Sequence, residues 1–140
     1  MKKLFFIGLA TLAVSSATLT SCSKYEEGPS LTLSSKTARL TGSWELTAQT
    51  TNGVAENLTG LTNTMTILKD GTYTITVAYL GFTYSNAGTW KFSDDKTQLI
   101  MTVNNMTGSN TQTIVRLAGK ELKLKSVDGT ETTISTYTAI

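Results

Sequence analysis

Residues 40–46 read LTGSWEL, and residues 86–92 keep the same order of glycine, tryptophan, charged residue and apolar residue in NAGTWKF. Side chains alternate between the two faces of a strand, so each tryptophan shares a face with the apolar residue two places later. The intervening Glu45 and Lys91 fall on the opposite face. We interpret the two stretches as strands that meet the same packing demand, not as an internal repeat.

The clearest neighbouring strand is Thr72–Tyr79. Tyr73, Ile75, Val77 and Tyr79 share one of its faces, and the threonines Thr72, Thr74 and Thr76 occupy the other. Alternation of this kind, interrupted by turns at short intervals, continues to the end of the chain and is typical of a barrel or sandwich. Eight strands are predicted: Ser43–Thr51, Thr64–Lys69, Thr72–Tyr79, Phe82–Ser93, Gln98–Val103, Thr111–Leu117, Glu121–Ser126 and Glu131–Ile140.

Turn signals separate these strands. Asp70-Gly71 between two apolar runs is a strong hairpin signal. Residues 52–63 and 104–110 are predicted as polar loops. Gly88 is predicted to mark a bulge or bend in its strand.

The composition supports an all-β domain. The chain has no histidine, and its one proline, Pro29, precedes the strands. Threonine is abundant and favours strands because it is β-branched. Only Ser35–Leu40 is expected to form a helical turn. Residues 36–140, about 105 residues, suit one domain, and residues 22–35 are predicted to be a flexible linker.

The motifs and their order resemble small lipocalin-like (calycin-type) lipoproteins of Gram-negative bacteria. The resemblance spans nearly the whole predicted domain. It implies a small antiparallel eight-stranded up-and-down barrel, with Trp44 closing one end. An immunoglobulin-like sandwich is the rival fold, and a Trp44 strand that did not pair with the last strand would favour it. The motifs are Leu40–Trp44, Asp70–Tyr73, Gly88–Trp90, Ser93–Asp95 and Leu117–Lys125.

Two features of full lipocalins are absent. These are a Thr-Asp-Tyr turn and an arginine in the last strand that covers the tryptophan. Arg39 and Arg116 are the candidates to stack on Trp44 instead. The domain is also shorter than a typical lipocalin, which leaves open whether it holds a deep cavity.

Residues 1–21 have the three parts of a secretory signal peptide. Lys2 and Lys3 precede an apolar segment of 11 residues, Leu4–Val14, which is too short for a spanning helix of roughly 20 residues. Leu19-Thr20-Ser21-Cys22 then resembles a lipobox, which implies cleavage before Cys22 and its acylation, with palmitate as a typical chain. The alternative is an ordinary secretory signal with a chance cysteine nearby.

The predicted lipid on Cys22 makes the protein a lipid-anchored outer-membrane protein of the cell envelope. Residues 23–27 read SKYEE, which resembles the signal that sends some Gram-negative lipoproteins to the cell surface. A solvated tether is the alternative interpretation of this segment. Which leaflet carries the domain is left open.

Charge and residue types argue against several functions. Without the two lysines of the signal peptide, 10 basic residues balance 10 acidic ones, so no nucleic-acid-binding patch is expected. Nucleophilic catalysis lacks a histidine base, and metal binding lacks histidine and free cysteine. The carboxylate pairs at residues 26–27 and 94–95 are interpreted as solvated surface. We therefore expect no enzyme, no metal and no cofactor.

The interior of an eight-stranded barrel is just wide enough to be filled with side chains or to hold one small ligand. Two functions of different classes follow. One is a carrier for a small hydrophobic molecule. The other is a structural or protein-interaction module with a packed core, which contacts an envelope partner through residues 52–63 and 104–110. Ligand identity, partner and oligomeric state are left open. The cavity candidates are Trp44, Tyr73, Tyr79, Trp90, Phe92 and Met101, with the two tyrosines foremost because buried hydroxyls need partners.

Overall fold

The computed structural model describes residues 25–27 and 33–140; Cys22 and the predicted signal peptide lie outside the described residues. One short helix precedes nine strands. The elements are α1 (Lys36–Leu40), β1 (Gly42–Thr51), β2 (Val54–Ala55), β3 (Leu61–Ile67), β4 (Thr72–Tyr79), β5 (Phe82–Phe92), β6 (Gln98–Val103), β7 (Asn110–Leu117), β8 (Glu121–Asp128) and β9 (Glu131–Ala139).

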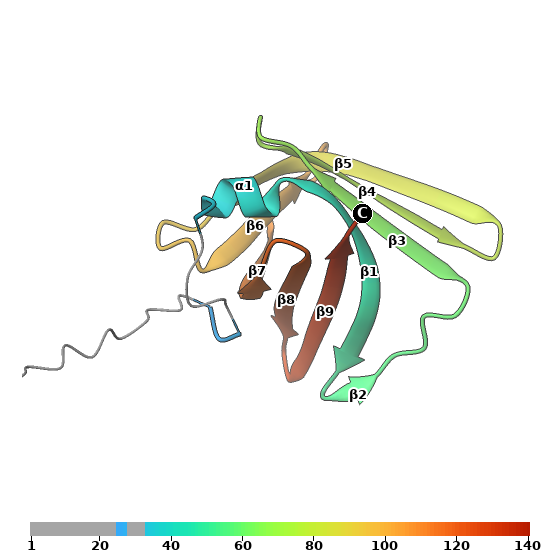
Figure 1. The fold of residues 1–140 in the computed structure, drawn as a ribbon. Coiled ribbons are helices and arrows are strands. Elements are labelled where there is room, and N and C mark those ends of the chain that lie inside the picture. Colours follow the sequence, from blue (N-terminus) through green and yellow to red (C-terminus); the bar gives the residue numbers. More distant parts are fainter. Residues whose placement is uncertain (1–24, 28–32) are drawn as a thin grey trace, which may run out of the picture.

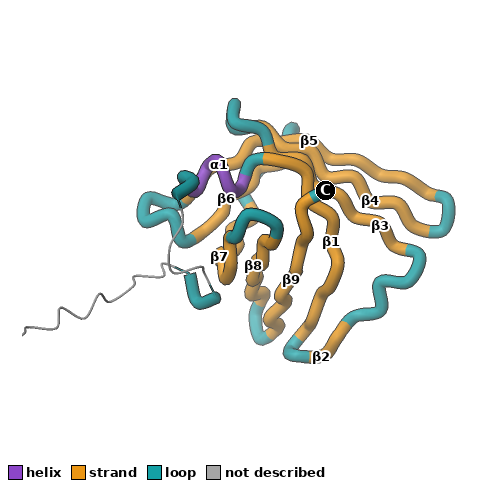
Figure 2. Tube along the Cα trace, viewed as in Figure 1, coloured by secondary structure: helices purple, strands orange, loops and turns teal. Residues whose placement is uncertain are grey.

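Eight of the strands form a closed antiparallel up-and-down barrel (Figures 1 and 2). Each strand pairs with the next along the chain from β3 to β9, and β1 pairs with both β3 and β9. The closing pair runs from Trp44 opposite Ala139 to Thr51 opposite Thr133. The predicted eight-stranded barrel is therefore confirmed, and the sandwich alternative is wrong because the Trp44 strand pairs with the last strand.

Three local predictions differ from the structure. The predicted loop 52–63 contains the short strand β2, which pairs with the end of β1, and its last three residues belong to β3. Pairing with residues 77–79 of β4 extends β3 back to Leu61. The bulge expected at Gly88 is absent, since Gly88 pairs regularly with both Tyr73 and Val103.

The register shifts occur elsewhere. One lies in β1 between Leu46 and Ala48, and the other in β7 between Ile114 and Arg116. A bulge increases local twist and bends its strand, which helps a sheet to close on itself. The first bulge lies in β1, a member of the closing pair, and the second lies in β7, two strands away from β9.

Position 88 requires glycine because its neighbours pack closely against it, and not because the strand bulges there. A Cβ atom at this position would lie 2.0 Å from the carbonyl oxygen of Thr102 and 2.8 Å from the Tyr73 ring. Neither distance is compatible with a side chain, and the first involves backbone that cannot swing aside. The strand β5 thus passes β6 and Tyr73 more closely than any other residue type allows.

The two ends of the barrel differ. The closed end comprises α1 and the connections 68–71, 93–97 and 118–120. The open end comprises the connections 52–60, 80–81, 104–109 and 129–130. Figure 1 shows α1 beside the start of β1, while the β4–β5 hairpin runs out in the opposite direction. No helix in the described part of the chain is long and apolar enough to cross a membrane.

Trp44 plugs the closed end. Its side chain is 2% exposed, and its indole Nε1 donates a hydrogen bond of 2.8 Å to the carbonyl oxygen of Leu40 at the end of α1. The Ser35 side chain caps α1 by accepting a hydrogen bond from Ala38 N. The surrounding apolar residues, all fully buried, are Leu40, Ile67, Leu99, Leu117 and Leu122.

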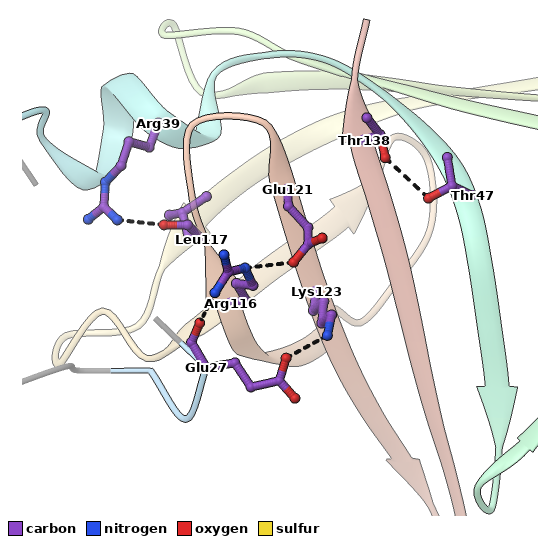
Figure 3. A network of polar contacts seen from close by, with 8 residues as sticks. All are labelled: Glu27, Arg39, Thr47, Arg116, Leu117, Glu121, Lys123 and Thr138. Atoms are coloured by element: carbon purple, nitrogen blue, oxygen red, sulfur yellow. Dashed lines mark hydrogen bonds and ion pairs between the residues drawn. The ribbon is translucent and has the colours of Figure 1, made fainter. Parts of the chain in front are cut away.

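The arginines expected to cover Trp44 bind other groups. Arg39 donates to the carbonyl oxygen of Leu117 at 2.5 Å. Arg116 Nε lies 2.6 Å from a carboxylate oxygen of Glu121 (Figure 3). The backbone of Leu40, and not a guanidinium group, therefore satisfies the polar atom of the tryptophan.

The segment Tyr25–Glu27 is bound to the barrel wall, although it lies inside the predicted flexible linker. Tyr25 is 5% exposed and belongs to the same buried cluster as Trp44. Glu27 contacts Arg116 and Lys123 (Figure 3). A fully solvated tether is therefore wrong for these three residues, because an aromatic ring and complementary charges attach them to the domain.

We expect Gly88→Ala to destabilise the protein by about 2 kcal/mol or more, because overpacking of this kind displaces backbone. Gly119→Ala is the matched control, since a Cβ there meets no atom within 4 Å. Urea unfolding followed by tryptophan fluorescence measures both variants. Equal stability of the two variants would show that Gly88 does not hold β5 against β6.

Candidate functional site

The inward-facing residues change character along the barrel axis. Residues opposite each other in an antiparallel pair share a face. The strand register therefore shows which residues face inward together with the buried ones. Near the closed end this face is apolar. Toward the open end it carries many amide and hydroxyl side chains, which are Gln49, Asn63, Asn86, Asn110, Gln112, Ser126, Thr133 and Ser135.

A cavity of about 210 Å³ lies where the two regions meet. One part of its lining is apolar and comes from β3, β4 and β6. The other part is polar and comes from β7 and β9. The lining residues are Met65, Tyr73, Ile75, Met101, Val103, Asn110, Gln112 and Tyr137.

The tyrosines of this cavity are held in the neutral form. Burial raises the pKa of the Tyr137 hydroxyl, and a hydrogen bond with the Ser135 side chain opposes part of this shift. Burial also raises the pKa of Tyr73. Both phenols can therefore donate a hydrogen bond at neutral pH.

Asn63 lies on the inward face of β3, two residues closer to the open end than Met65. Its Oδ1 atom is buried and has no hydrogen-bond partner among the described residues. A buried acceptor without a donor is costly. A donor group entering the barrel at this level would remove that cost.

Two larger depressions adjoin the cavity toward the open end. One, of about 310 Å³, is formed by the ends of β6 and β7 and their connection, and it shares Met101, Val103 and Asn110 with the cavity. The other, of about 410 Å³, lies along β7, β8 and β9 and includes Asn110 together with Asp128 and Glu131. Asn110 thus stands at the junction of all three spaces.

The charges at the open end have one sign. Its loops and the strand ends beside them carry Glu56, Asp128 and Glu131, and they carry no lysine or arginine. The basic residues of the described chain lie on α1, on the outer wall or at the closed end. No charged side chain lines the interior cavity.

The predicted cavity residues fall into four groups, of which Tyr79 forms the last. Tyr73 and Met101 line the cavity. Trp44 lies at the closed end, beyond the cavity. Trp90 and Phe92 pack against the core with their rings perpendicular at 5.5 Å, and Trp90 donates its indole hydrogen to Leu68 O.

Tyr79 is half exposed and does not line the cavity. It shares a face with Tyr73, as predicted, and it pairs with Leu61 of β3. On the other side of the hairpin, however, β6 pairs with β5 only from Gly88 to Phe92. Tyr79 therefore lies on a part of the hairpin that β6 does not flank.

Six lining residues were not among the predicted cavity residues: Met65, Ile75, Val103, Asn110, Gln112 and Tyr137. A signal was present in residues 110–114, where Asn110 and Gln112 alternate in step with the apolar Ile114. Polar residues at inward positions mark a wet or liganded interior, because a dry core would exclude them.

The described residues contain no group of three or more histidine, cysteine, aspartate and glutamate side chains that could hold a metal ion. The Asp94-Asp95 pair lies in the β5–β6 turn. Asp95 accepts hydrogen bonds from the Ser93 hydroxyl and from the amide and hydroxyl of Thr97. These contacts give Asp95 a role in shaping the turn.

The fold and its interior define a class of protein: a small, closed up-and-down barrel with a cavity between an apolar and a polar wall. Residues 40–124 match the family of lipocalin-like domains, which covers more than half of the chain. The chain belongs to this family.

Solved structures of similar fold come from distant proteins. Japanin from Rhipicephalus appendiculatus, described as bound to cholesterol, is 15% identical with a TM-score of 0.53, over 76% of this chain and 80% of that one. The odorant-binding protein from bovine nasal mucosa is 13% identical with a TM-score of 0.47, over 79% and 77%. The similarity to japanin supports the fold alone. No curated protein matches the chain.

We expect Tyr137→Phe to change how stability depends on pH. An unfolded tyrosine ionises near pH 10, whereas burial raises the pKa of Tyr137 in the folded protein. The contribution of the buried neutral hydroxyl is fully present below about pH 10 and is lost as the pH rises through the folded pKa.

The free energy of unfolding of the wild type should therefore fall, relative to that of Tyr137→Phe, above about pH 10. Urea unfolding at several pH values between about 8 and 11 measures the difference. Tyr79→Phe, which removes a half-exposed hydroxyl, is the control. A constant difference between wild type and Tyr137→Phe across this range would contradict the burial of the hydroxyl.

Proposed function

We propose that the protein is a lipid-anchored, non-catalytic carrier that binds one small molecule in the interior cavity. The observation that carries this proposal is the composition of the cavity, where an apolar wall faces Asn110, Gln112 and Tyr137. Convergent polar groups in an apolar pocket are typical of ligand sites. Membership of the lipocalin-like family supports the same function.

The cavity volume limits the size of the ligand. A cavity of about 150 Å³ holds a molecule the size of benzene, so 210 Å³ suits a body of about eight to ten non-hydrogen atoms. The cholesterol named for the japanin structure is too large for this space. The ligand we propose is therefore compact.

The cavity chemistry favours an uncharged ligand. A carboxylate entering the cavity would lose its hydration without gaining a cationic partner, which is costly. The acidic residues at the open end add a weaker repulsion of anions. Hydroxyl or amide groups suit the site better, because they can exchange hydrogen bonds with Asn110, Gln112 and Tyr137.

A matched series of six-carbon compounds tests this specificity. We expect hexanamide and hexan-1-ol to bind at least tenfold more tightly than hexanoate in calorimetric titrations. Tyr137→Phe should weaken hexanamide binding about fivefold, which corresponds to the loss of one hydrogen bond of about 1 kcal/mol. Tyr79→Phe, whose hydroxyl lies outside the cavity, should leave binding unchanged.

Two results would count against the proposal. Hexanoate binding as tightly as hexanamide would contradict the ligand chemistry while leaving a carrier function. Absence of binding for every compound of the series would contradict the carrier function itself.

Lipid anchoring is the second part of the proposal, and it rests on the lipobox-like residues 19–22. We place the domain at the outer membrane of a Gram-negative envelope. Cys22→Ser should move the protein from the membrane fraction to the soluble fraction, because acylation requires the cysteine thiol. Ser21→Ala is the control. Membrane association that survives Cys22→Ser would contradict a lipid anchor at this residue.

One observation favours a second candidate, a protein-interaction module. The tip of the β4–β5 hairpin exposes Tyr79, Leu80, Phe82 and Tyr84 by 50%, 74%, 81% and 60%. Exposed apolar residues gathered in one place often mark contact sites. Leu80 adopts a φ of +47°, where glycine or asparagine would be more usual.

The adjoining strand edge has the same character. β6 pairs with β5 only from Gly88 to Phe92, so among the described residues most of the segment 82–87 has no strand partner on that side. Such an edge can accept an extended segment of another protein. Two results together would favour this function over the carrier. One is a stable envelope partner whose binding is lost in Phe82→Asp, and the other is an empty cavity.

A further inference from the structure

The segment Tyr25–Glu27, which we call the clasp, begins three residues after Cys22. The Tyr25 hydroxyl donates a hydrogen bond of 3.0 Å to the carbonyl oxygen of Lys96. The Lys36 ammonium group lies 4.6 Å from the centre of the Tyr25 ring, within the range of a cation–π contact. A single aromatic residue thus bridges α1 and the β5–β6 turn.

Glu27 attaches the clasp to β7 and β8. Its backbone N–H donates to Val115 O at 2.9 Å, and its carbonyl oxygen accepts from Arg116 Nη1 at 2.5 Å. Its carboxylate lies 2.5 Å from Lys123 Nζ (Figure 3). Both backbone groups and the side chain of one residue are therefore bound to the wall.

Glu26 extends this contact, since its carboxylate lies 3.8 Å from Lys125 Nζ. Exposed ion pairs of this kind contribute little individually. Combined with the buried Tyr25 ring and the backbone hydrogen bonds, they give the clasp a specific seat on the barrel. Val115, whose carbonyl oxygen accepts the hydrogen bond from Glu27, lies at the β7 bulge and is only 3% exposed.

The seat of the clasp lies toward the closed end. Lys96 belongs to the connection 93–97, and Arg116 lies next to the end of β7 at Leu117, where Arg39 of α1 also binds. The open end and its connections lie at the other end of these strands. The chain that carries Cys22 therefore meets the barrel far from the cavity entrance.

We infer that the clasp fixes the closed end toward the bilayer and directs the open end away from it. This inference rests on the proposed acylation of Cys22. Three residues of extended chain span at most about 11 Å, so the lipid is attached close to the bound Tyr25. A free linker over residues 22–35 would instead allow the barrel to move by up to about 50 Å.

The charge distribution supports the same orientation independently. Glu56, Asp128 and Glu131 give the open end an acidic character without any neighbouring base. Membranes that contain anionic lipids repel such a surface and attract basic residues. The closed end carries Lys36, Lys69, Lys96 and Lys120, interspersed with acids.

This orientation bears on how a ligand arrives. A cavity that opens away from the bilayer receives its ligand from the aqueous side. A barrel that extracted lipids from its own membrane would place its entrance against the surface. The compact, hydrogen-bonding ligand class proposed above is consistent with aqueous entry.

Energy transfer to the membrane surface tests the inference. The acylated full-length protein is placed in phosphatidylcholine vesicles that contain a small fraction of acceptor-labelled headgroups. A fluorescent donor is attached to a single added cysteine, either Asp94→Cys at the closed end or Thr107→Cys at the open end. We expect transfer to be at least twofold more efficient from position 94 than from position 107.

The clasp variant Tyr25→Ala combined with Glu27→Ala should reduce this difference by at least half, because the barrel then moves on the whole linker. Tyr79→Ala combined with Glu131→Ala is the matched control, which removes a tyrosine and a glutamate at the other end. The control should keep the difference of the parent protein.

Three outcomes would overturn the inference. More efficient transfer from position 107 would reverse the orientation. Equal transfer from the two positions, or no effect of the clasp variant, would show that the clasp does not hold the barrel at the surface. The mass of the N-terminal peptide is measured first: an unacylated Cys22 overturns the lipid anchor and this inference together, whereas acylation with equal transfer overturns the orientation alone.

Discussion

The pairing of β1 with β9 is the interaction on which the rest of the structure depends. It joins the first long strand to the last and removes the edges that an open sheet would leave. The pairing places Trp44 opposite Ala139 at the closed end. It also completes the wall that brings Tyr137 of β9 to the cavity. Without it, neither the plug nor the polar side of the cavity would exist.

Closure also explains the division of the interior. At one end, Trp44 and the fully buried leucines belong to one apolar cluster beside α1. Farther along, the inward positions carry amides and hydroxyls that a dry core would not tolerate. The cavity lies at the boundary between the apolar closed end and the polar open end. Its apolar wall continues the first region, and its polar wall continues the second. The same gradient separates the end that we propose to be anchored from the open end.

Much of the barrel could be predicted from the sequence because its signals are local. Alternation in Thr72–Tyr79, the Asp70-Gly71 turn and the tryptophan at position 44 each depend on a few adjacent residues. The site depends on which strands become neighbours and how far each extends. Tyr73 was predicted to line the cavity because a buried hydroxyl needs a partner, and Met101 was a further candidate, whereas Asn110 was assigned to the loop 104–110 and Gln112 was not a candidate.

The remaining differences have the same origin. Tyr79 lies on the predicted face, but on a part of the β4–β5 hairpin that β6 does not flank. The contact of Tyr25 with Lys96 joins residues separated by 71 positions, and no local pattern in a polar segment indicates such a partner. Gly88 was expected to break the regular pairing, yet it permits the closest approach of β5 to β6. Long-range packing, not local preference, determines these three features.

The central claim is that the barrel carries a small uncharged molecule. Native mass spectrometry of the protein released gently from its own membranes tests this claim most directly. The account predicts an additional mass of one compact neutral molecule, lost on mild activation and present at lower occupancy in Tyr137→Phe at the same protein concentration. A protein that carries no such mass, with an interior shown to be filled by its own side chains, would contradict the account.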